Sequence, residues 1–153
     1  MNLMDVLPKL LPRAIAWVEN QYAFIAKNGQ PLSESEKELA RRIGVLRPDL
    51  IRVYGVPLLP LPEDPELRQV AIATNMLGPD MVGLTLGHGI YICHGHRNTR
   101  LLSHEFRHVY QYEQAGSIAA FLPLYLTQIA TVGYHNAPFE MDARAHEIHM
   151  APS

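Results

Sequence analysis

The chain of 153 residues has little cysteine and little charge, and each shortage excludes a class of protein. Its single cysteine, Cys93, cannot form a disulfide within the chain, so nothing requires an oxidising compartment. Thirteen Lys and Arg stand against fifteen Asp and Glu, for a net charge of −2, and the basic residues form no run. This pattern lacks the basic footprint of nucleic-acid-binding proteins, so we expect no nucleic acid partner.

The N-terminal sequence also lacks the basic start, apolar stretch and small-residue cleavage site of a secretory signal, so we expect a cytoplasmic protein. Residues 1–24 instead predict an amphipathic helix that Pro8 and Pro12 break and that packs on the core. A membrane-surface anchor is the alternative. The 48% of hydrophobic residues and the chain length predict one globular domain rather than a disordered chain.

A third shortage is local, because residues 114–139 contain no Asp, Glu, Lys or Arg. The stretch is long enough for a transmembrane helix. It also contains glycine, proline and several polar residues, which favour a buried pair of helices instead, so we expect no membrane partner. The alternative, a membrane span, would carry the residues before and after it to opposite sides of a bilayer.

The first half of the chain contains two helix signals. A capping box at Ser33 and Glu36 begins a helix that Gly44 ends. The segment Asp64-Pro65-Glu66 begins a second helix, with Gly78-Pro79 as its expected end. Between them, residues 48–65 hold five prolines and predict an extended connection with a short strand at residues 50–54.

The second half predicts a small sheet followed by helices. MVGLTL and IYICH flank Gly87-His88-Gly89, which indicates two short strands with a tight turn or one bent strand with a bulge. A helix capped by Asn98 or Thr99 follows and ends at Gly116, and two further helices lie beyond it. The order predicts an α+β fold in one domain over residues 1–153. Residues 1–79 form its support and residues 80–149 its site-bearing core.

All eight histidines lie between His88 and His149, which places metal or acid–base chemistry in the second half of the chain. The sharpest motif there is an HExxH that begins at His104 and lies within a helix. Positions four apart are about 40° apart around a helix, so His104 and His108 can both reach one Zn²⁺. Glu105 then lies beside the metal, where it is suited to take a proton from zinc-activated water and pass it to a leaving amine.

Two histidines leave zinc under-coordinated, because a catalytic site has three protein ligands and a water. The downstream candidates are Glu113, His135, Glu140, Asp142, His146, Glu147 and His149. Glu113 lies five residues past His108 on the same helix, so it rotates off the zinc face. Glu140 lies in the first turn of the last helix, where a carboxylate suits the helix dipole. Thirty-two residues separate it from His108, which allows one intervening helix to double back.

These residues resemble a known family. HEFRHVYQY, followed by GYHNAPFEMDARA, resembles the gluzincin branch of the zincin metallopeptidases. It is particularly similar to small bacterial zincin-like domains of unknown function that pair HExxH-V-x-Q with a downstream N-P-x-E-x-(E/D)-A. The resemblance covers residues 83–144. It implies a mostly helical zincin-like fold with a small sheet, whose edge strand in GLTLGHGIYI precedes the HExxH helix and pairs with an extended peptide substrate.

The resemblance also implies an activity, that of a zinc metallopeptidase with a peptide or protein substrate. By it, His104, His108 and Glu140 hold one Zn²⁺ per chain and Glu105 is the general base. The chain departs from the family at Arg144, where thermolysin-like members carry an Asp that orients a zinc histidine. Asp142 would face away in a helix, which leaves that orienting role unassigned.

For the remaining polar residues and for the overall function, the sequence leaves more than one interpretation open. Tyr134 and His135 are candidates to stabilise the oxyanion of a tetrahedral intermediate, or are ordinary loop residues. His94 and His96 share a face if their segment is a strand, and are a second metal pair or solvated side chains. The alternative function is a zinc-stabilised binding or structural module that cleaves nothing, with a closed and buried site. The sequence leaves the oligomeric state open.

Overall fold

The computed structural model describes residues 2–78 and 80–149, which form an α+β fold, as expected. In chain order, the helices in this part of the chain are α1 (Leu3–Asn28), α2 (Glu34–Ile43), η1 (Pro48–Leu50, a 3₁₀ helix), α3 (Pro65–Ala73), α4 (Thr99–Ala115), α5 (Ile118–Val132) and α6 (Pro138–Ala145). The strands are β1 (Gln30–Pro31), β2 (Arg52–Val56), β3 (Gly83–Leu86) and β4 (Gly89–Cys93).

The four strands form one mixed sheet in the order β1-β2-β4-β3. Strands β2 and β4 are parallel, and the other two pairs are antiparallel. Strands β3 and β4 form a hairpin in which Gly87 adopts a φ of 68°, a conformation that suits glycine in a two-residue turn. Of the two predicted arrangements, the pair of short strands with a tight turn is therefore the one that the structure shows. Strand β3 lies at the edge of the sheet, while β4 directly precedes α4.

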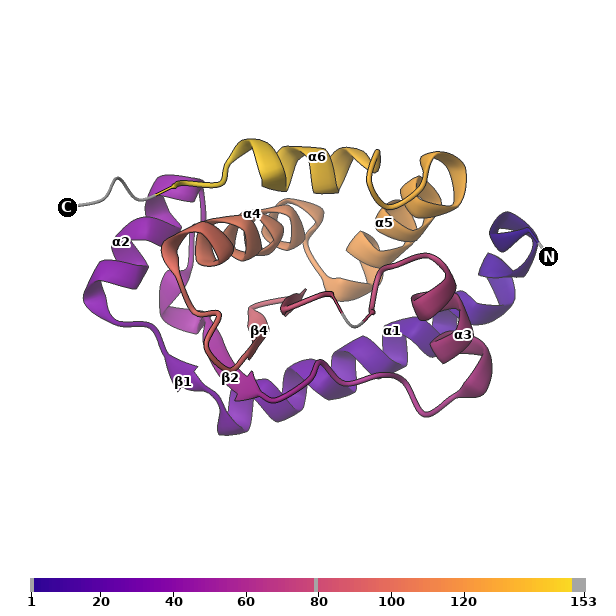
Figure 1. Cartoon of the computed structure of the whole chain (residues 1–153), viewed down its shortest axis with the longest axis horizontal. Coiled ribbons are helices and arrows are strands. Elements are labelled where there is room, and N and C mark those ends of the chain that lie inside the picture. Colours follow the sequence, from indigo (N-terminus) through magenta and orange to yellow (C-terminus); the bar gives the residue numbers. More distant parts are fainter. Residues whose placement is uncertain (1, 79, 150–153) are drawn as a thin grey trace.

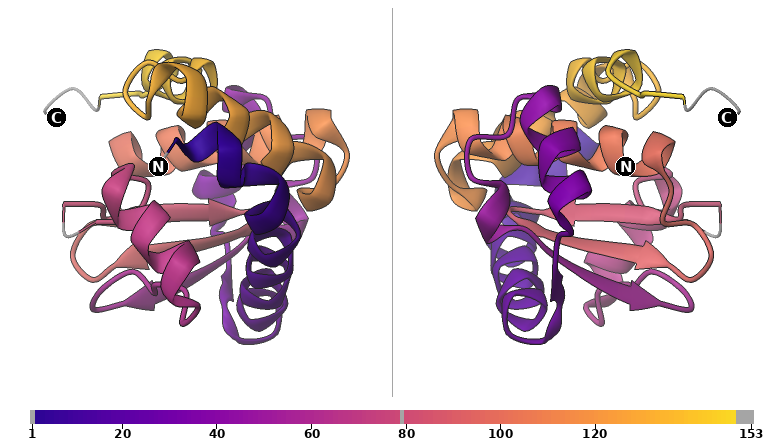
Figure 2. Two further views of the ribbon diagram at one scale, coloured as in Figure 1. Left: turned by 90° about the vertical axis from the view of Figure 1, so that its right-hand side faces the viewer. Right: turned by 90° about the vertical axis from the view of Figure 1, so that its left-hand side faces the viewer.

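Helices cover both faces of this sheet (Figures 1 and 2). Side chains alternate along a strand, so Ile90 and Ile92 of β4 pack with α4 and α2, whereas Tyr91 packs with α1 and α5. The Tyr91 hydroxyl donates a 2.6 Å hydrogen bond to Gln21 on α1. The site-bearing helix α4 and the long helix α1 are thereby fixed on opposite faces of the sheet.

The helix starts agree with the capping signals in the sequence. Ser33 and Glu36 form the reciprocal capping box of α2. Asp64 accepts hydrogen bonds from two backbone amides at the start of α3, and Asn98 caps α4. These contacts satisfy amides that have no partner within the helix, which is why short polar residues precede the apolar stretches.

Two predicted interruptions are wrong. Helix α1 continues from Leu3 to Asn28 through both Pro8 and Pro12. The two prolines lie four residues apart on the exposed side of α1, so the carbonyls that lose an amide donor face water. Helix α3 ends at Ala73, before Gly78, because Asn75 adopts a left-handed φ of 62°. Pro79, the other part of that expected stop, lies outside the described residues.

The uncharged stretch, residues 114–139, contains the end of α4, all of α5 and the start of α6. None of the helices in the described ranges is long and apolar enough by itself to span a membrane. Helices α4 and α5 meet that criterion only as a pair, and they are bent by 116°. Helix α5 thus doubles back and allows α6 to lie along α4 (Figure 1).

Candidate metal centre

Helices α4 and α6 bring together three side chains that can hold a metal ion. His104, His108 and Glu140 each offer one ligand atom, and these atoms lie within 4.8 Å of one another. The Nε2 atom of His104 is 3.4 Å from Glu140 Oε1, and Nε2 of His108 is 3.1 Å from Oε2. The three residues that the sequence analysis selected as ligands therefore converge in the fold.

Local structure and aromatic packing together position these side chains. The two histidines are four residues apart on α4, so they project from one face of that helix. Glu140 lies in the first turn of α6, directly after Pro138 opens the helix. Phe139 beside it stacks on Phe121 of α5, with ring centroids 5.0 Å apart. The turn of chain that carries Glu140 is thus anchored to α5.

The carboxylate of Glu140 fits a cation better than it fits the protein alone. Glu140 is only 2% exposed, and its Oε2 accepts a 2.8 Å hydrogen bond from the Tyr125 hydroxyl. Among the described residues, its Oε1 is the one buried side-chain oxygen or nitrogen without a hydrogen-bond partner. A buried carboxylate oxygen without a partner is costly unless a cation or donor approaches it. The donor set of two imidazoles and one carboxylate is one that zinc accepts.

Both histidines are oriented by a hydrogen bond from the second ring nitrogen. His104 Nδ1 lies 2.8 Å from a carboxylate oxygen of Glu147. His108 Nδ1 lies 2.8 Å from the amide oxygen of Gln111, whose nitrogen donates to Phe139 O and to Asp142. Because this network turns the amide oxygen towards His108, Nδ1 is the donor and Nε2 faces Glu140.

Sequence reasoning left these orienting residues unassigned. Gln111 had a local signal, because it lies three residues after His108 on the same helix, where side chains meet. The sequence suggests Glu147 only as a metal ligand, and it follows the end of α6, so only the fold reveals its contact with His104. Asp142 acts one step further out, where it accepts hydrogen bonds from Gln111 and from Arg107.

Burial and charge shift the proton equilibria of the cluster. Burial alone would lower the pKa of His108, but the adjacent Glu140 carboxylate outweighs it and raises the pKa to about 9. Burial would raise the pKa of Glu140, yet the two imidazoles hold it well below its usual range. Burial and the Glu140 charge raise the pKa of Tyr125 and of Tyr134, so both phenols stay protonated donors. Glu140 is therefore an ionised carboxylate surrounded by hydrogen-bond donors.

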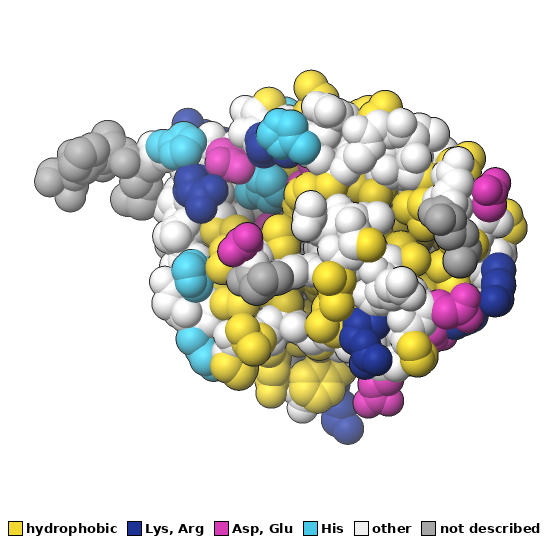
Figure 3. All heavy atoms as spheres, turned by 45° about the vertical axis from the view of Figure 1, so that its right-hand side comes forward, with side chains coloured by type: hydrophobic (Ala, Val, Ile, Leu, Met, Phe, Trp, Pro, Cys, Tyr) yellow, Lys and Arg dark blue, Asp and Glu magenta, His cyan; other side chains and the backbone are white. Residues whose placement is uncertain are grey.

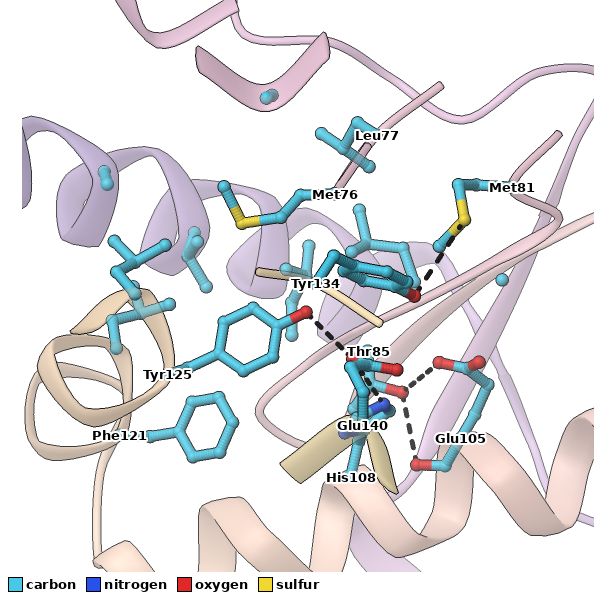
Figure 4. Close-up of a pocket in the computed structure, with 18 of the residues that line it drawn as sticks. Met76, Leu77, Met81, Thr85, Glu105, His108, Phe121, Tyr125, Tyr134 and Glu140 are labelled. Carbon is cyan, nitrogen blue, oxygen red and sulfur yellow. Dashed lines mark hydrogen bonds and ion pairs between the residues drawn. The ribbon is translucent and has the colours of Figure 1, made fainter. Parts of the chain in front are cut away.

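Glu105 is held beside the three candidate ligands, and its carboxylate is not one of their clustered atoms. It is 4% exposed, and its Oε1 accepts a 2.8 Å hydrogen bond from the Thr85 hydroxyl on β3 (Figure 4). A Cβ atom at Gly83 would lie 3.0 Å from Glu105 Oε2. Glycine at that position on the edge strand thus leaves room for the carboxylate.

The two oxyanion candidates lie in different environments. Tyr134 lines the same cavity as the ligands, and its hydroxyl lies 3.9 Å from the Met81 sulfur. His135 is exposed, and its backbone carbonyl accepts a hydrogen bond from Arg144. Of the two, Tyr134 is therefore the residue that lines the cavity of the candidate ligands.

Other polar residues that the sequence singled out lie apart from this cluster. His94 and His96 are exposed in the segment between β4 and α4. Glu113 pairs with His88 at 2.9 Å and accepts hydrogen bonds from the backbone amides of Leu46 and Arg47. Across residues 2–78 and 80–149, His104, His108 and Glu140 form the one group of His, Cys, Asp and Glu with metal-binding geometry.

Comparison with known proteins adds no relative to this description. The chain matches no protein-family model, no curated protein and no solved structure. The resemblance to the gluzincins therefore stays a prediction from the motif residues.

Proposed function

We propose that this chain is a zinc-dependent hydrolase of amide bonds, a metallopeptidase of zincin type. His104, His108 and Glu140 are the proposed zinc ligands. The observation that carries the proposal is the buried Oε1 of Glu140, which has no hydrogen-bond partner, in a carboxylate that faces two imidazoles whose other nitrogens are already engaged. This arrangement favours a bound cation, because burying a carboxylate oxygen without a cation or donor costs free energy.

Hydrolysis of an amide bond by this mechanism needs a Lewis acid and a general base held at fixed positions relative to each other. A bound Zn²⁺ supplies polarisation of a carbonyl and lowers the pKa of a water to about 7. Glu105 takes a proton from the attacking water and delivers it to the leaving nitrogen. The Thr85 hydroxyl holds the Glu105 carboxylate in place through a hydrogen bond, and Gly83 leaves space for that carboxylate. Tyr134 donates its hydroxyl proton in a hydrogen bond to the developing oxyanion.

The position of strand β3 favours the proposal of a peptide substrate. It lies at the edge of the sheet, and its four residues line the cavity that contains His104, Glu105 and His108. An edge strand has backbone groups free to pair with an extended chain. Two of the three candidate ligands, His108 and Glu140, are buried and His104 is partly buried, which is what a structural zinc module would also show, so this alternative function is a second candidate.

Glu105→Gln distinguishes the two functions. The substitution keeps size and polarity but removes the base, so we expect zinc content to stay at one ion per chain and hydrolysis of a peptide library to fall roughly 10²–10⁴-fold. Elemental analysis and single-turnover assays measure the two quantities. Glu113→Gln, which alters a carboxylate outside the site, is the control. Zinc binding without any cleavage by the unmodified protein would favour the structural module, and a purified protein without transition metal after zinc addition would refute both.

A further inference from the structure

The cavity beside the candidate ligands continues along helix α1. Its volume is about 340 Å³, and α1 contributes the lining residues Leu3, Leu7, Leu10, Ala14, Trp17 and Val18. The first five of these residues are spaced alternately four and three positions apart, which places them on one face of the helix. At 1.5 Å per residue, this stripe is about 21 Å long. The cavity is therefore long and narrow.

The two ends of the cavity differ in chemistry. Every lining residue that α1 and α3 contribute is apolar, as are Met76 and Leu77 (Figure 4). The charged lining residues all come from residue 80 onwards, and they include His104, Glu105 and Glu140. Figure 3 shows hydrophobic side chains gathered on this face of the molecule, with histidines to one side of them and charged side chains at the opposite edge.

This contrast limits what can occupy the apolar end. A peptide backbone can pair with β3, but along the walls formed by α1 and α3 its amides would have few donors or acceptors and would be costly to bury. A hydrocarbon chain carries no such groups. A volume of about 340 Å³ is at the lower end of the range for small-molecule sites, about 300–1,000 Å³, which suits one slender chain.

We propose that the substrate is an amide whose acyl part is a long, unbranched hydrocarbon chain, which lies along the α1 stripe while its carbonyl reaches the candidate ligands. This inference rests on the proposed hydrolase function. In the reaction, the water oxygen bonds to the acyl carbon, the carbon–nitrogen bond breaks, and the nitrogen takes the proton that Glu105 carries. The products are a carboxylic acid and an amine, and no oxidant or reductant is needed.

Chain length is the variable that tests this assignment. The zinc-loaded protein is assayed with N-acyl-glycine amides that carry acyl chains of about 2, 6, 10 and 14 carbons. Each buried CH₂ is worth about 0.8 kcal/mol, so kcat/KM should rise about fourfold per methylene until the cavity is full. A parallel series with the same chains on a tetrapeptide shows whether the amine side is a small molecule or a peptide. Equal kcat/KM for all lengths, or a preference for short acyl groups next to bulky amino acids, overturns the assignment.

Ala14→Phe tests where the chain lies, because Ala14 is in the middle of the stripe and a phenyl ring there would obstruct the cavity. The gain in kcat/KM should then stop at a shorter chain than in the unmodified protein. Ala16→Phe places the same ring on the exposed side of α1 and is the matched control. Circular dichroism and bound zinc show whether both variants are folded. The same cut-off length in both variants would mean that the chain does not run along α1.

Binding without turnover separates this inference from the proposed function. The affinity of n-alkyl carboxylates of the same lengths is measured by calorimetry with zinc-loaded Glu105→Gln. The acyl cavity is supported if affinity rises with chain length and if Ala14→Phe makes that rise stop at a shorter chain. This holds even if no amide is cleaved, in which case only the hydrolase proposal fails. Cleavage of short amides without any dependence on chain length in either assay refutes the acyl cavity and leaves the hydrolase proposal standing.

Discussion

Two histidine pairs in this chain lie close together in the sequence but have very different surroundings. His104 and His108 lie on α4 under α6, close to a buried carboxylate. His94 and His96 lie only a few residues earlier, in an exposed segment between β4 and α4. Spacing alone allows either pair to face one metal. The difference shows that a metal site depends on the surrounding shell, which must supply a third ligand, orient each ring and exclude water.

Of the changes that test this contrast, we expect removal of the histidine pair on α4 to have the largest effect. We expect the double variant His104→Ala, His108→Ala to bind no zinc, because two of the three proposed ligands disappear. The matched variant His94→Ala, His96→Ala should keep one zinc per chain. Elemental analysis after dialysis measures both. Retention of zinc by the first variant, or its loss from the second, would reverse the assignment.

A smaller effect should come from the residue that orients His104. Glu147 and Glu113 both pair with a histidine, at 2.8 and 2.9 Å, but only Glu147 contacts a candidate ligand. Glu147→Ala should weaken zinc affinity about 10–100-fold, since the ring loses its orienting partner. Glu113→Ala should leave that affinity unchanged, although it removes hydrogen bonds to two backbone amides and so costs stability. Competition with a zinc chelator gives the affinities, and equal losses would show that Glu147 has no special role.

The smallest effect concerns the exposed histidine segment. Arg97, next to His96, pairs with Glu36 of α2. Burial would raise the pKa of Glu36, but hydrogen bonds from Arg97 and from the Ser33 backbone lower it overall. Because the pKa of Glu36 is lowered in the folded protein, the ionised Glu36 stabilises the fold above its unfolded pKa, near pH 4.5. This stabilisation is lost as pH falls below that value.

Glu36→Gln should therefore reduce the free energy of unfolding at pH 7 by up to about 1 kcal/mol. The difference from the unmodified protein should be smaller at pH 3 than at pH 7, because the stabilising ionised form of Glu36 is lost as pH falls below its unfolded pKa. Urea unfolding at the two pH values measures this. A difference that grows on acidification would contradict the assigned direction of the pKa shift.

Helix starts and the hairpin were predictable because their causes are local. Ser33, Asp64 and Asn98 cap helices through hydrogen bonds to amides two or three residues away, and Gly87 is suited to a tight turn. The continuity of α1 was not predictable, because the cost of its prolines depends on which side of the helix faces water. That side is decided by the sheet and by α5, which pack against α1 from distant parts of the sequence.

The sequence by itself determined that α4 presents two histidines and a glutamate with the spacing of a metal site, because helical geometry acts over four residues. Only the tertiary structure decided that Glu140 meets them with one oxygen unpartnered, that Glu147 orients His104, and that a long apolar cavity reaches the site. These features join residues more than thirty positions apart. They depend on how α5 turns the chain back and on how α1 packs across the sheet, and such packing is a property of the whole core rather than of any short segment.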